Sequence, residues 1–275
     1  RPKATLSRRV ADLEAALGVR LFERGSHALK LTQEGRALYE RTDRLLGELG
    51  EAASVIASGG DIPRGRLRIS APLLFSQMAL GTLSAEFALR YPEVRLEITT
   101  EDRAVDMVEE GYDLVIRVNP DPDERLIGRV LLRDRLVAVA HPGLPRPGAA
   151  TPVPAVVRVS SEQAYWTLGT PAGERRMDVV PVLRLASLTM MRDAVRTGIG
   201  AAVLPLSLVA GELRTGALAH WGDIGGPPIE IWALYPSRRL LSSRVSAFLQ
   251  CLKEAFPRGQ PEELAAYAEG TAPMR

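Results

Sequence analysis

The side chains whose types and spacing suggest chemistry are the cations at the start of the chain. Residues 1–31 hold seven lysines and arginines against three acids, whereas the whole 275-residue chain has a net charge of only +2. The remainder is therefore slightly acidic. A basic segment on a nearly neutral body predicts a local contact with a polyanion such as double-stranded DNA.

A short amphipathic helix carries most of these cations. Leu6, Val10, Leu13 and Leu17 recur at spacings of four, three and four residues, and Gly18 follows as a helix stop. The opposite face is small, hydroxylic and basic, which suits entry into a DNA major groove. Its candidate DNA contacts are Lys3, Thr5, Ser7, Arg8 and Arg9. The alternative is an ordinary surface helix that carries two arginines.

The next residues, LFERGSHALKLT at 21–32, predict a short β-wing. Its candidate phosphate or minor-groove contacts are Arg24, His27 and Lys30. Thr32 can then cap a long helix that extends to about residue 58. Leu38, Leu45, Leu49, Ala52 and Ile56 form a heptad seam on it, which predicts dimerisation, the alternative being packing onto its own domain.

From residue 66 onward, strand and helix patterns alternate, which predicts α/β lobes with parallel sheets. Strands are expected at 66–70, 94–100, 113–118, 135–141, 155–159, 201–205 and 229–236, and helices at 71–91, 103–111, 187–198, 206–216 and 242–256. The Pro/Gly-rich segment 141–154 divides the two lobes. A small molecule is expected between them, beyond the carboxyl ends of the strands.

Twelve residues are candidates for that ligand. They are Ser70, Ala71, Pro72, Leu73, Thr100, Glu101, Asp102, Arg117, Ser187, Leu188, Gly198 and Ile199. The helix start after Ser70 suits an anion or another polar acceptor, although Ser70 could equally cap that helix. Two acids at 101–102 argue against a ligand that is only a carboxylate, unless Arg103 or Arg117 offsets them. Gly198 and Ile199 could simply form a turn.

Several other chemistries lack their motifs. No phosphate-binding or nucleophile-elbow motif occurs, and the three histidines lack metal-ligand spacing, so we expect no enzyme, metal or cofactor. The single Cys251 permits no internal disulfide and is expected to be a small buried residue. No membrane span or signal peptide is recognisable, which favours a cytoplasmic protein over an exported solute-binding protein.

The segment 6–38 resembles the DNA-binding region of LysR-type transcriptional regulators. The shared motifs are Ser7-Arg8, Leu13-Glu14, Leu17-Gly18, Leu21-Phe22 with Arg24, and Leu31-Thr32 with Gly35. Phrases such as EGYDLVIR (110–117) and RTGIGAAVLP (196–205) resemble the family's effector domain. The resemblance implies a winged helix-turn-helix, a dimerisation helix and a periplasmic-binding-protein-like effector domain. It also implies an operator, a small-molecule effector, a homodimer or homotetramer, and RNA polymerase as a further partner.

The resemblance also sets the expected domain limits. They are 1–31 for the DNA-binding domain, 32–58 for the linker helix, 59–65 for the hinge, 66–141 with 237–256 for the first lobe, 142–236 for the second and 257–275 for a tail. Two helices precede the recognition helix in the family, so the chain is expected to begin inside that helix.

Overall fold

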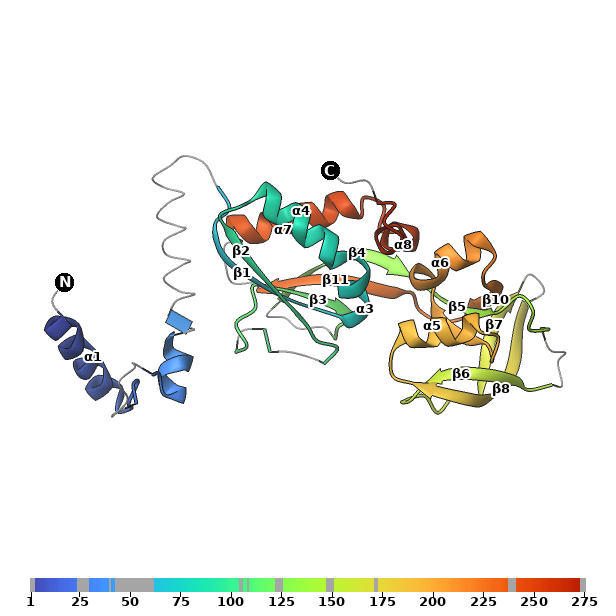
Figure 1. Ribbon diagram of the computed structural model, residues 1–275, viewed down its shortest axis with the longest axis horizontal. Coiled ribbons are helices and arrows are strands. Elements are labelled where there is room, and N and C mark those ends of the chain that lie inside the picture. Colours follow the sequence, from blue (N-terminus) through green and yellow to red (C-terminus); the bar gives the residue numbers. More distant parts are fainter. Residues whose placement is uncertain are drawn as a thin grey trace.

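The computed structural model describes most of the chain in ten segments. They are residues 3–23, 30–39, 41–42, 62–103, 106–107, 109–121, 126–146, 151–170, 173–236 and 241–272. An N-terminal helical part is followed by a body of two lobes, each built on its own β-sheet (Figure 1). The expected two-lobed α/β body after an N-terminal helical part is therefore confirmed.

The N-terminal part is organised by local capping. Helix α1 (Lys3–Leu17) ends at Gly18, whose φ of 69° is a left-handed conformation that favours glycine. The Glu14 carboxylate then accepts the backbone N–H of Leu21 at 2.7 Å and of Phe22 at 3.2 Å. Phe22 pairs with Leu31 in an antiparallel bridge, as expected for the base of a wing. The chain thus folds back beside α1.

Thr32 starts the next helix, as predicted. Its hydroxyl accepts the backbone N–H of Gly35 at 3.0 Å, and residues 33–39 are helical. Gly35 is buried directly against the backbone of Leu21, so this helix lies on the turn that follows α1.

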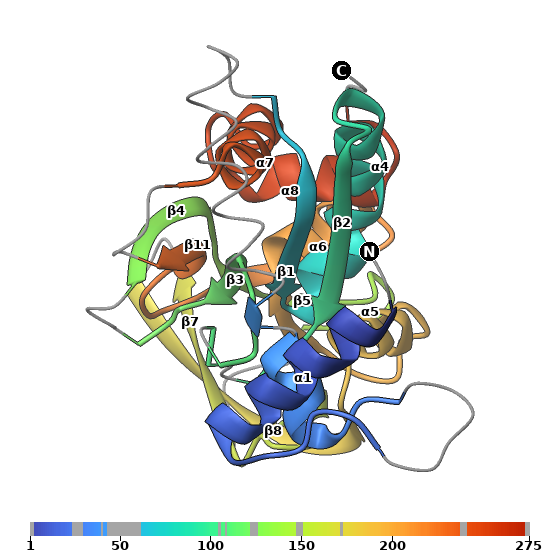
Figure 2. The ribbon, with the colours of Figure 1, turned by 90° about the vertical axis from the view of Figure 1, so that its left-hand side faces the viewer.

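The first lobe is a five-stranded mixed sheet in the order β2-β1-β3-β11-β4. Its strands are β1 (Gly65–Ala71), β2 (Val94–Thr100), β3 (Leu114–Val118), β4 (Leu126–Asp134) and β11 (Ile229–Pro236). β1 is parallel to β2 and β3, whereas β11 is antiparallel to β3 and β4. Helices α4 (Gly81–Arg90) and α7 (Ser243–Ala255) cover one face (Figures 1 and 2). α4 continues a helix begun by α3 (Leu73–Phe75) and a π-helical turn at Ser76–Leu80.

The second lobe is a six-stranded mixed sheet in the order β6-β8-β7-β10-β5-β9. Its strands are β5 (Leu136–Ala140), β6 (Val153–Arg158), β7 (Tyr165–Thr170), β8 (Gly173–Leu185), β9 (Ala202–Pro205) and β10 (Ala219–Ile224). Helices α5 (Leu188–Arg196) and α6 (Leu206–Thr215) lie beside β9. The bridge between Ala155 and Ala201 brings β6 back to the β9 edge, so the sheet is strongly curled.

The chain crosses between the lobes at two places that differ from those predicted. It enters the second lobe at Arg135, between β4 and β5, rather than near 141–150. It returns through residues 225–228, between β10 and β11, rather than near 236. The predicted lobe limits at 141/142 and 236/237 are therefore each wrong by one strand. β5 belongs to the second lobe rather than the first, and β11 belongs to the first lobe rather than the second.

Two further expectations are wrong. The sheets are mixed rather than parallel, since β11 and most of the second sheet pair antiparallel. No helix is present at 103–111 in the residues that the structure describes there, which form bends and turns. Met107 and Tyr112 are instead buried against Val115, and this packing decides the local conformation.

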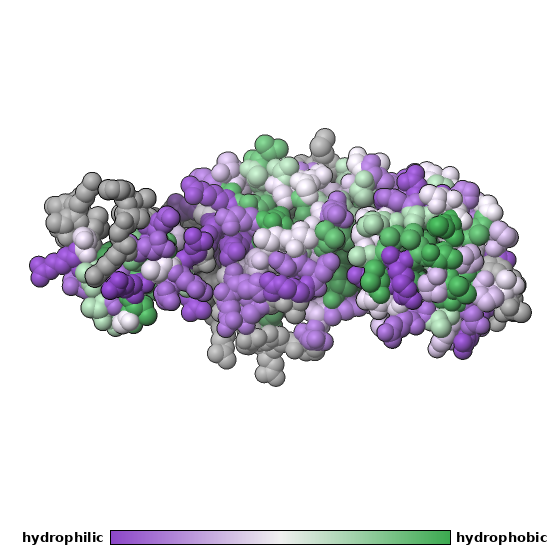
Figure 3. Space-filling model, turned by 60° about the horizontal axis from the view of Figure 1, so that its bottom comes forward, coloured by the Kyte–Doolittle hydropathy of each residue, from purple (hydrophilic) through white to green (hydrophobic). Residues whose placement is uncertain are grey.

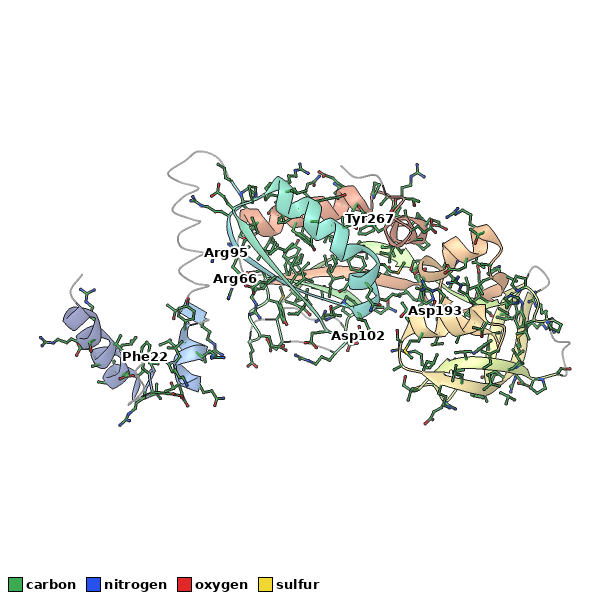
Figure 4. All side chains as sticks on the ribbon, in the orientation of Figure 1. Phe22, Arg66, Arg95, Asp102, Asp193 and Tyr267 are labelled. Atoms are coloured by element: carbon green, nitrogen blue, oxygen red, sulfur yellow. The ribbon has the colours of Figure 1, made fainter. Side chains whose placement is uncertain are left out.

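The segment beyond 257, expected to be a tail, contains a helix that belongs to the core. Helix α8 (Pro261–Ala268) begins with a capping box formed by Gln260 and Glu263. It packs against α6 of the second lobe and against the Ser76–Leu80 turn and β4 of the first. Leu264 is 1% exposed. Tyr267, labelled in Figure 4, packs against Phe256 with the two rings tilted to each other. α8 therefore bridges the two lobes.

Leu264→Ala is expected to destabilise the protein by about 2–5 kcal/mol, the usual cost of truncating a fully buried leucine. Leu89→Ala is the matched control, because Leu89 is 84% exposed on α4, and its expected change is within about 0.5 kcal/mol. Urea unfolding followed by circular dichroism measures both. Equal stabilities of the two variants would show that α8 contributes little to the core.

Candidate functional site

Three of the candidate DNA contacts on α1 are described with their side chains. Ser7, Arg8 and Arg9 are exposed, as is Lys30 after the turn. Lys3 and Thr5 belong to α1, although the structure does not describe their side chains. Arg24 and His27 lie outside the described residues. In Figure 3 the visible face of the first lobe is mostly hydrophilic apart from an apolar patch along its upper edge, whereas apolar side chains gather on the second lobe.

The apolar stripe of α1 is only partly covered. Leu13 and Leu17 are 44% and 47% exposed. Of the five residues assigned to the dimer seam, Leu38 lies on the helix that starts after Thr32 and is half-buried. Leu45, Leu49, Ala52 and Ile56 lie outside the described residues, so the seam stays a prediction.

A pocket of about 550 Å³ lies between the two lobes. This volume is within the usual range for small-molecule sites. The first lobe contributes residues from α3, β4 and β11, and the second contributes residues from β6, α5 and β9, with Leu264 of α8 at the wall. The wall is therefore assembled from segments that are far apart in the sequence.

Five of the twelve predicted effector contacts line this pocket. They are Pro72, Leu73, Asp102, Ser187 and Leu188. Figure 4 shows Asp102 at the edge of the first lobe that faces the second. Its carboxylate accepts the backbone N–H of Leu73 at 2.9 Å and thus caps the helix that starts there. That N–H, which the sequence suggested for an anionic ligand, is already bonded to an acid.

Ser70 and Arg117 form a separate contact behind the pocket wall. Ser70 is fully buried, and its hydroxyl accepts a hydrogen bond from the Arg117 guanidinium at 2.9 Å. It does not cap the helix, whose N-cap is Pro72. Burial lowers the pKa of Arg117 below its usual range. Neither Ser70 nor Arg117 lines the pocket, and the same holds for Ala71, Thr100 and Glu101.

Gly198 and Ile199 also lie outside the pocket wall. Gly198 has a φ of 85° and follows the last turn of α5, so it acts as a helix stop. Gly200 fits closely against the backbone of Pro154, where a Cβ atom would lie 2.6 Å from the carbonyl oxygen. These glycines therefore form the tight turn that was the alternative prediction.

Sequence reasoning missed the most buried charged group of the pocket wall, Asp134. Asp134 ends β4 next to the crossing at Arg135 and is 4% exposed. Its carboxylate accepts the backbone N–H of Arg135 at 2.7 Å and, from the first turn of α6, the backbone N–H of Ser207 at 3.3 Å. It therefore ties the first lobe to the positive end of a helix in the second. An acid two residues after the apolar run VLL (130–132) was the available signal.

The ionisation of Asp134 should be visible in the pH dependence of stability. Burial raises the pKa of its carboxyl above the usual value. The Asp134 carboxyl therefore binds its proton more tightly in the folded protein than in the unfolded chain, where its pKa is about 3.9. The stabilisation of the fold by this proton is complete below the unfolded pKa and is lost as the pH rises through the folded pKa. Asp134→Asn does not titrate, so its free energy of unfolding relative to wild type should increase across this window. A pH-independent difference in urea unfolding would contradict this.

Other chemistry is limited in the part of the chain that the structure describes. Its residues include no cluster of three or more His, Cys, Asp or Glu side chains that could hold a metal ion. None of its helices is both long and apolar enough to cross a membrane. Cys251 is a partly buried free cysteine, and burial raises the pKa of its thiol, which lowers its reactivity.

Comparison with known families gives two matches that together cover most of the chain. Residues 1–36 match the bacterial regulatory helix-turn-helix protein, lysR family, and residues 60–257 match the LysR substrate binding domain. Helix α8 thus lies beyond the second match.

Individual proteins agree with these matches. The HTH-type transcriptional regulator PtxR of Pseudomonas aeruginosa is 34% identical over 279 residues, covering 96% of this chain and 87% of PtxR. The structure of CrgA, a LysR-type transcriptional regulator from Neisseria meningitidis, is 25% identical with a TM-score of 0.61 and covers 92% of this chain and 89% of that one. The Vibrio cholerae virulence activator AphB shares the fold at 24% identity and a TM-score of 0.60, covering 93% and 90%.

Proposed function

This chain belongs to the LysR family of bacterial transcriptional regulators, and from that we propose that a small molecule bound between its two lobes modulates its binding to operator DNA. The observation that carries the proposal is the 550 Å³ pocket, whose wall combines both lobes and includes Asp134 at the first crossing. A ligand in that position contacts both lobes at once. It therefore has different affinities for different lobe angles, which is the requirement for coupling to a distant site.

The DNA-binding part of the proposal rests on α1 and the turn that follows it. Ser7, Arg8 and Arg9 occupy one exposed end of the helix, where arginine is suited to bind guanine in a major groove. Lys30, with Arg24 and His27 of the predicted wing, would hold the phosphate backbone. A homodimer joined through the helix after Thr32 would present two such units to two half-sites.

A pocket-filling substitution tests the coupling between pocket and DNA. Ser161 lines the pocket on the loop before β7, and Ser161→Trp places an indole between the lobes. We expect this variant to change operator affinity by roughly fivefold or more, a typical allosteric coupling. The measurement is fluorescence anisotropy with the DNA upstream of the protein's own gene, over a salt series. Specific binding should weaken steeply with salt.

The matched control is Ser246→Trp, because Ser246 is exposed on α7 and does not line the pocket. Its operator affinity should equal that of the wild type. Equal affinities for all three proteins would show that the pocket is not coupled to DNA binding, and binding without salt dependence would contradict the DNA-binding assignment itself.

A further inference from the structure

The charged groups of the pocket wall are unequal in sign and in burial. Asp134 is 4% exposed, and Asp102 is a second acid in the wall. Arg158 is the single cation among the lining residues, and its side chain is exposed at the end of β6. The buried part of the pocket therefore carries negative rather than positive charge.

A second buried polar group, the Ser207 hydroxyl, lies beside Asp134. The Ser207 side chain is 2% exposed and lines the same pocket. Its Oγ lies close enough to the Asp134 carboxylate to favour the ionised form of that carboxyl, but within the part of the chain that the structure describes it makes no hydrogen bond of acceptable geometry. Buried polar groups without partners are costly, and such a group in a pocket wall indicates a site that a bound molecule satisfies.

The backbone positions these two groups together. The Ser207 N–H donates to Asp134 Oδ1 at 3.3 Å and to Oδ2 at 3.4 Å, so the carboxylate and the hydroxyl share one end of α6. The carboxylate keeps acceptor capacity beyond the two N–H groups that it binds. Much of the remaining wall is apolar, with Val156, Met191, Val203 and Ile231 among its residues.

We propose that the effector is an apolar amine, whose ammonium group donates hydrogen bonds to the Asp134 carboxylate and the Ser207 hydroxyl while its hydrocarbon part fills the pocket. This inference rests on the proposed function, because it specifies the chemistry of the same site. An ammonium ion offsets the buried negative charge and satisfies both acceptors, and an apolar body matches the rest of the wall.

A carboxylate ligand fits these groups poorly. It would place a second negative charge beside Asp134 and would leave the Asp134 acceptor sites unfilled. The N–H of Leu73 already binds Asp102 at 2.9 Å. Among the side chains of the wall, a carboxylate could pair only with the exposed Arg158, and the first-turn N–H groups of α5 at Leu188 and Thr189 are further donors for it. The experiment separates these modes from the proposed one.

Isothermal titration calorimetry with three ligands of one carbon skeleton tests the head group. The ligands are phenylbutylamine, phenylbutanol and phenylbutyrate. We expect the amine to bind at least about tenfold more tightly than the carboxylate, since hydrogen bonds to charged partners are the strong ones. Equal or tighter binding of phenylbutyrate, or no binding of the amine, would overturn the proposal.

Three variants locate the contact. Asp134→Asn keeps an acceptor oxygen for the backbone N–H groups but removes the charge, and it should weaken amine binding about tenfold or more. Ser207→Ala removes a hydroxyl that makes no hydrogen bond of acceptable geometry in the described structure, so it should weaken amine binding with little change in the free energy of unfolding. Arg158→Gln removes the one cation among the lining residues and should not weaken amine binding. Amine binding that survives Asp134→Asn, or that depends on Arg158, would overturn the assignment.

The two proposals fail in different ways. If Ser161→Trp changes operator affinity but the amine does not bind, the amine inference is wrong and the effector mechanism stands. If the amine binds through Asp134 but leaves operator affinity unchanged, the head-group assignment is correct and the proposed coupling to DNA is wrong.

Discussion

Replacing Arg8 by alanine is expected to lower operator affinity roughly tenfold to a hundredfold while leaving the fold intact. Arg8 is exposed on α1, away from the apolar stripe that contains Leu13, so its truncation removes no core contact. An arginine paired with guanine contributes about 1–3 kcal/mol of discrimination between bases. Fluorescence anisotropy with operator and with a scrambled duplex measures both affinity and specificity.

The way in which Arg8→Ala weakens binding tells which contact it makes. Loss of sequence discrimination indicates a base contact, whereas a uniform loss with a salt slope reduced by about one indicates a phosphate contact. Arg129→Ala is the matched control, because Arg129 is exposed on β4 of the effector domain. If both variants bind operator as the wild type does, the assignment of this α1 face to the DNA groove is wrong.

Replacing Gly35 by alanine should disrupt the DNA-binding part and leave the effector domain folded. A Cβ atom at Gly35 would overlap the backbone carbonyl of Leu21, which cannot move aside as a flexible side chain could. Overpacking of a closed contact costs about 1–3 kcal/mol or more, a large share of the stability of so small a unit. We expect operator affinity to fall at least about tenfold, with the displacement of this helix from the turn after α1.

Gly81→Ala is the control for this substitution. Gly81 lies at the start of α4, where a Cβ atom would meet nothing within 4 Å, so alanine there should be neutral or stabilise the protein by up to about 1 kcal/mol. Ligand binding should be the same for both variants, and thermal unfolding of the effector domain should be unchanged by Gly35→Ala and unchanged or slightly raised in temperature by Gly81→Ala. Normal operator binding by Gly35→Ala would show that the helix after Thr32 relaxes without affecting DNA contact.

The sequence by itself determined the features that depend on neighbouring residues. The stop at Gly18, the cap at Thr32, most of the helices and the strands around them follow from spacing, capping and glycine conformation. These depend on hydrogen bonds and periodicities within a few residues, which a single sequence displays directly. The family motif also has a visible local cause, because Glu14 binds the backbone of Leu21 and Phe22.

The pairing of distant segments could not be predicted from the sequence and is visible only in the folded structure. The direction of β11, the crossing points of the lobes and the position of α8 across them depend on contacts between residues far apart in the chain. The β7–β8 hairpin was missed although Met177 and Val179 alternate with exposed neighbours in β8. At 103–111, burial of Met107 and Tyr112 overrides the helical pattern.

The pocket wall contains both kinds of residue, those that local sequence signals indicate and those that only the fold brings together. Sequence reasoning placed Asp102 and Leu188 in it, because helix starts and the carboxyl ends of strands are local signals. It could not find Asp134 and Ser207, which are 73 positions apart and meet only because the end of β4 lies against the first turn of α6. Packing between distant segments buries both side chains and leaves their oxygens able to accept further hydrogen bonds. The chemistry of this site therefore exists only in the folded protein.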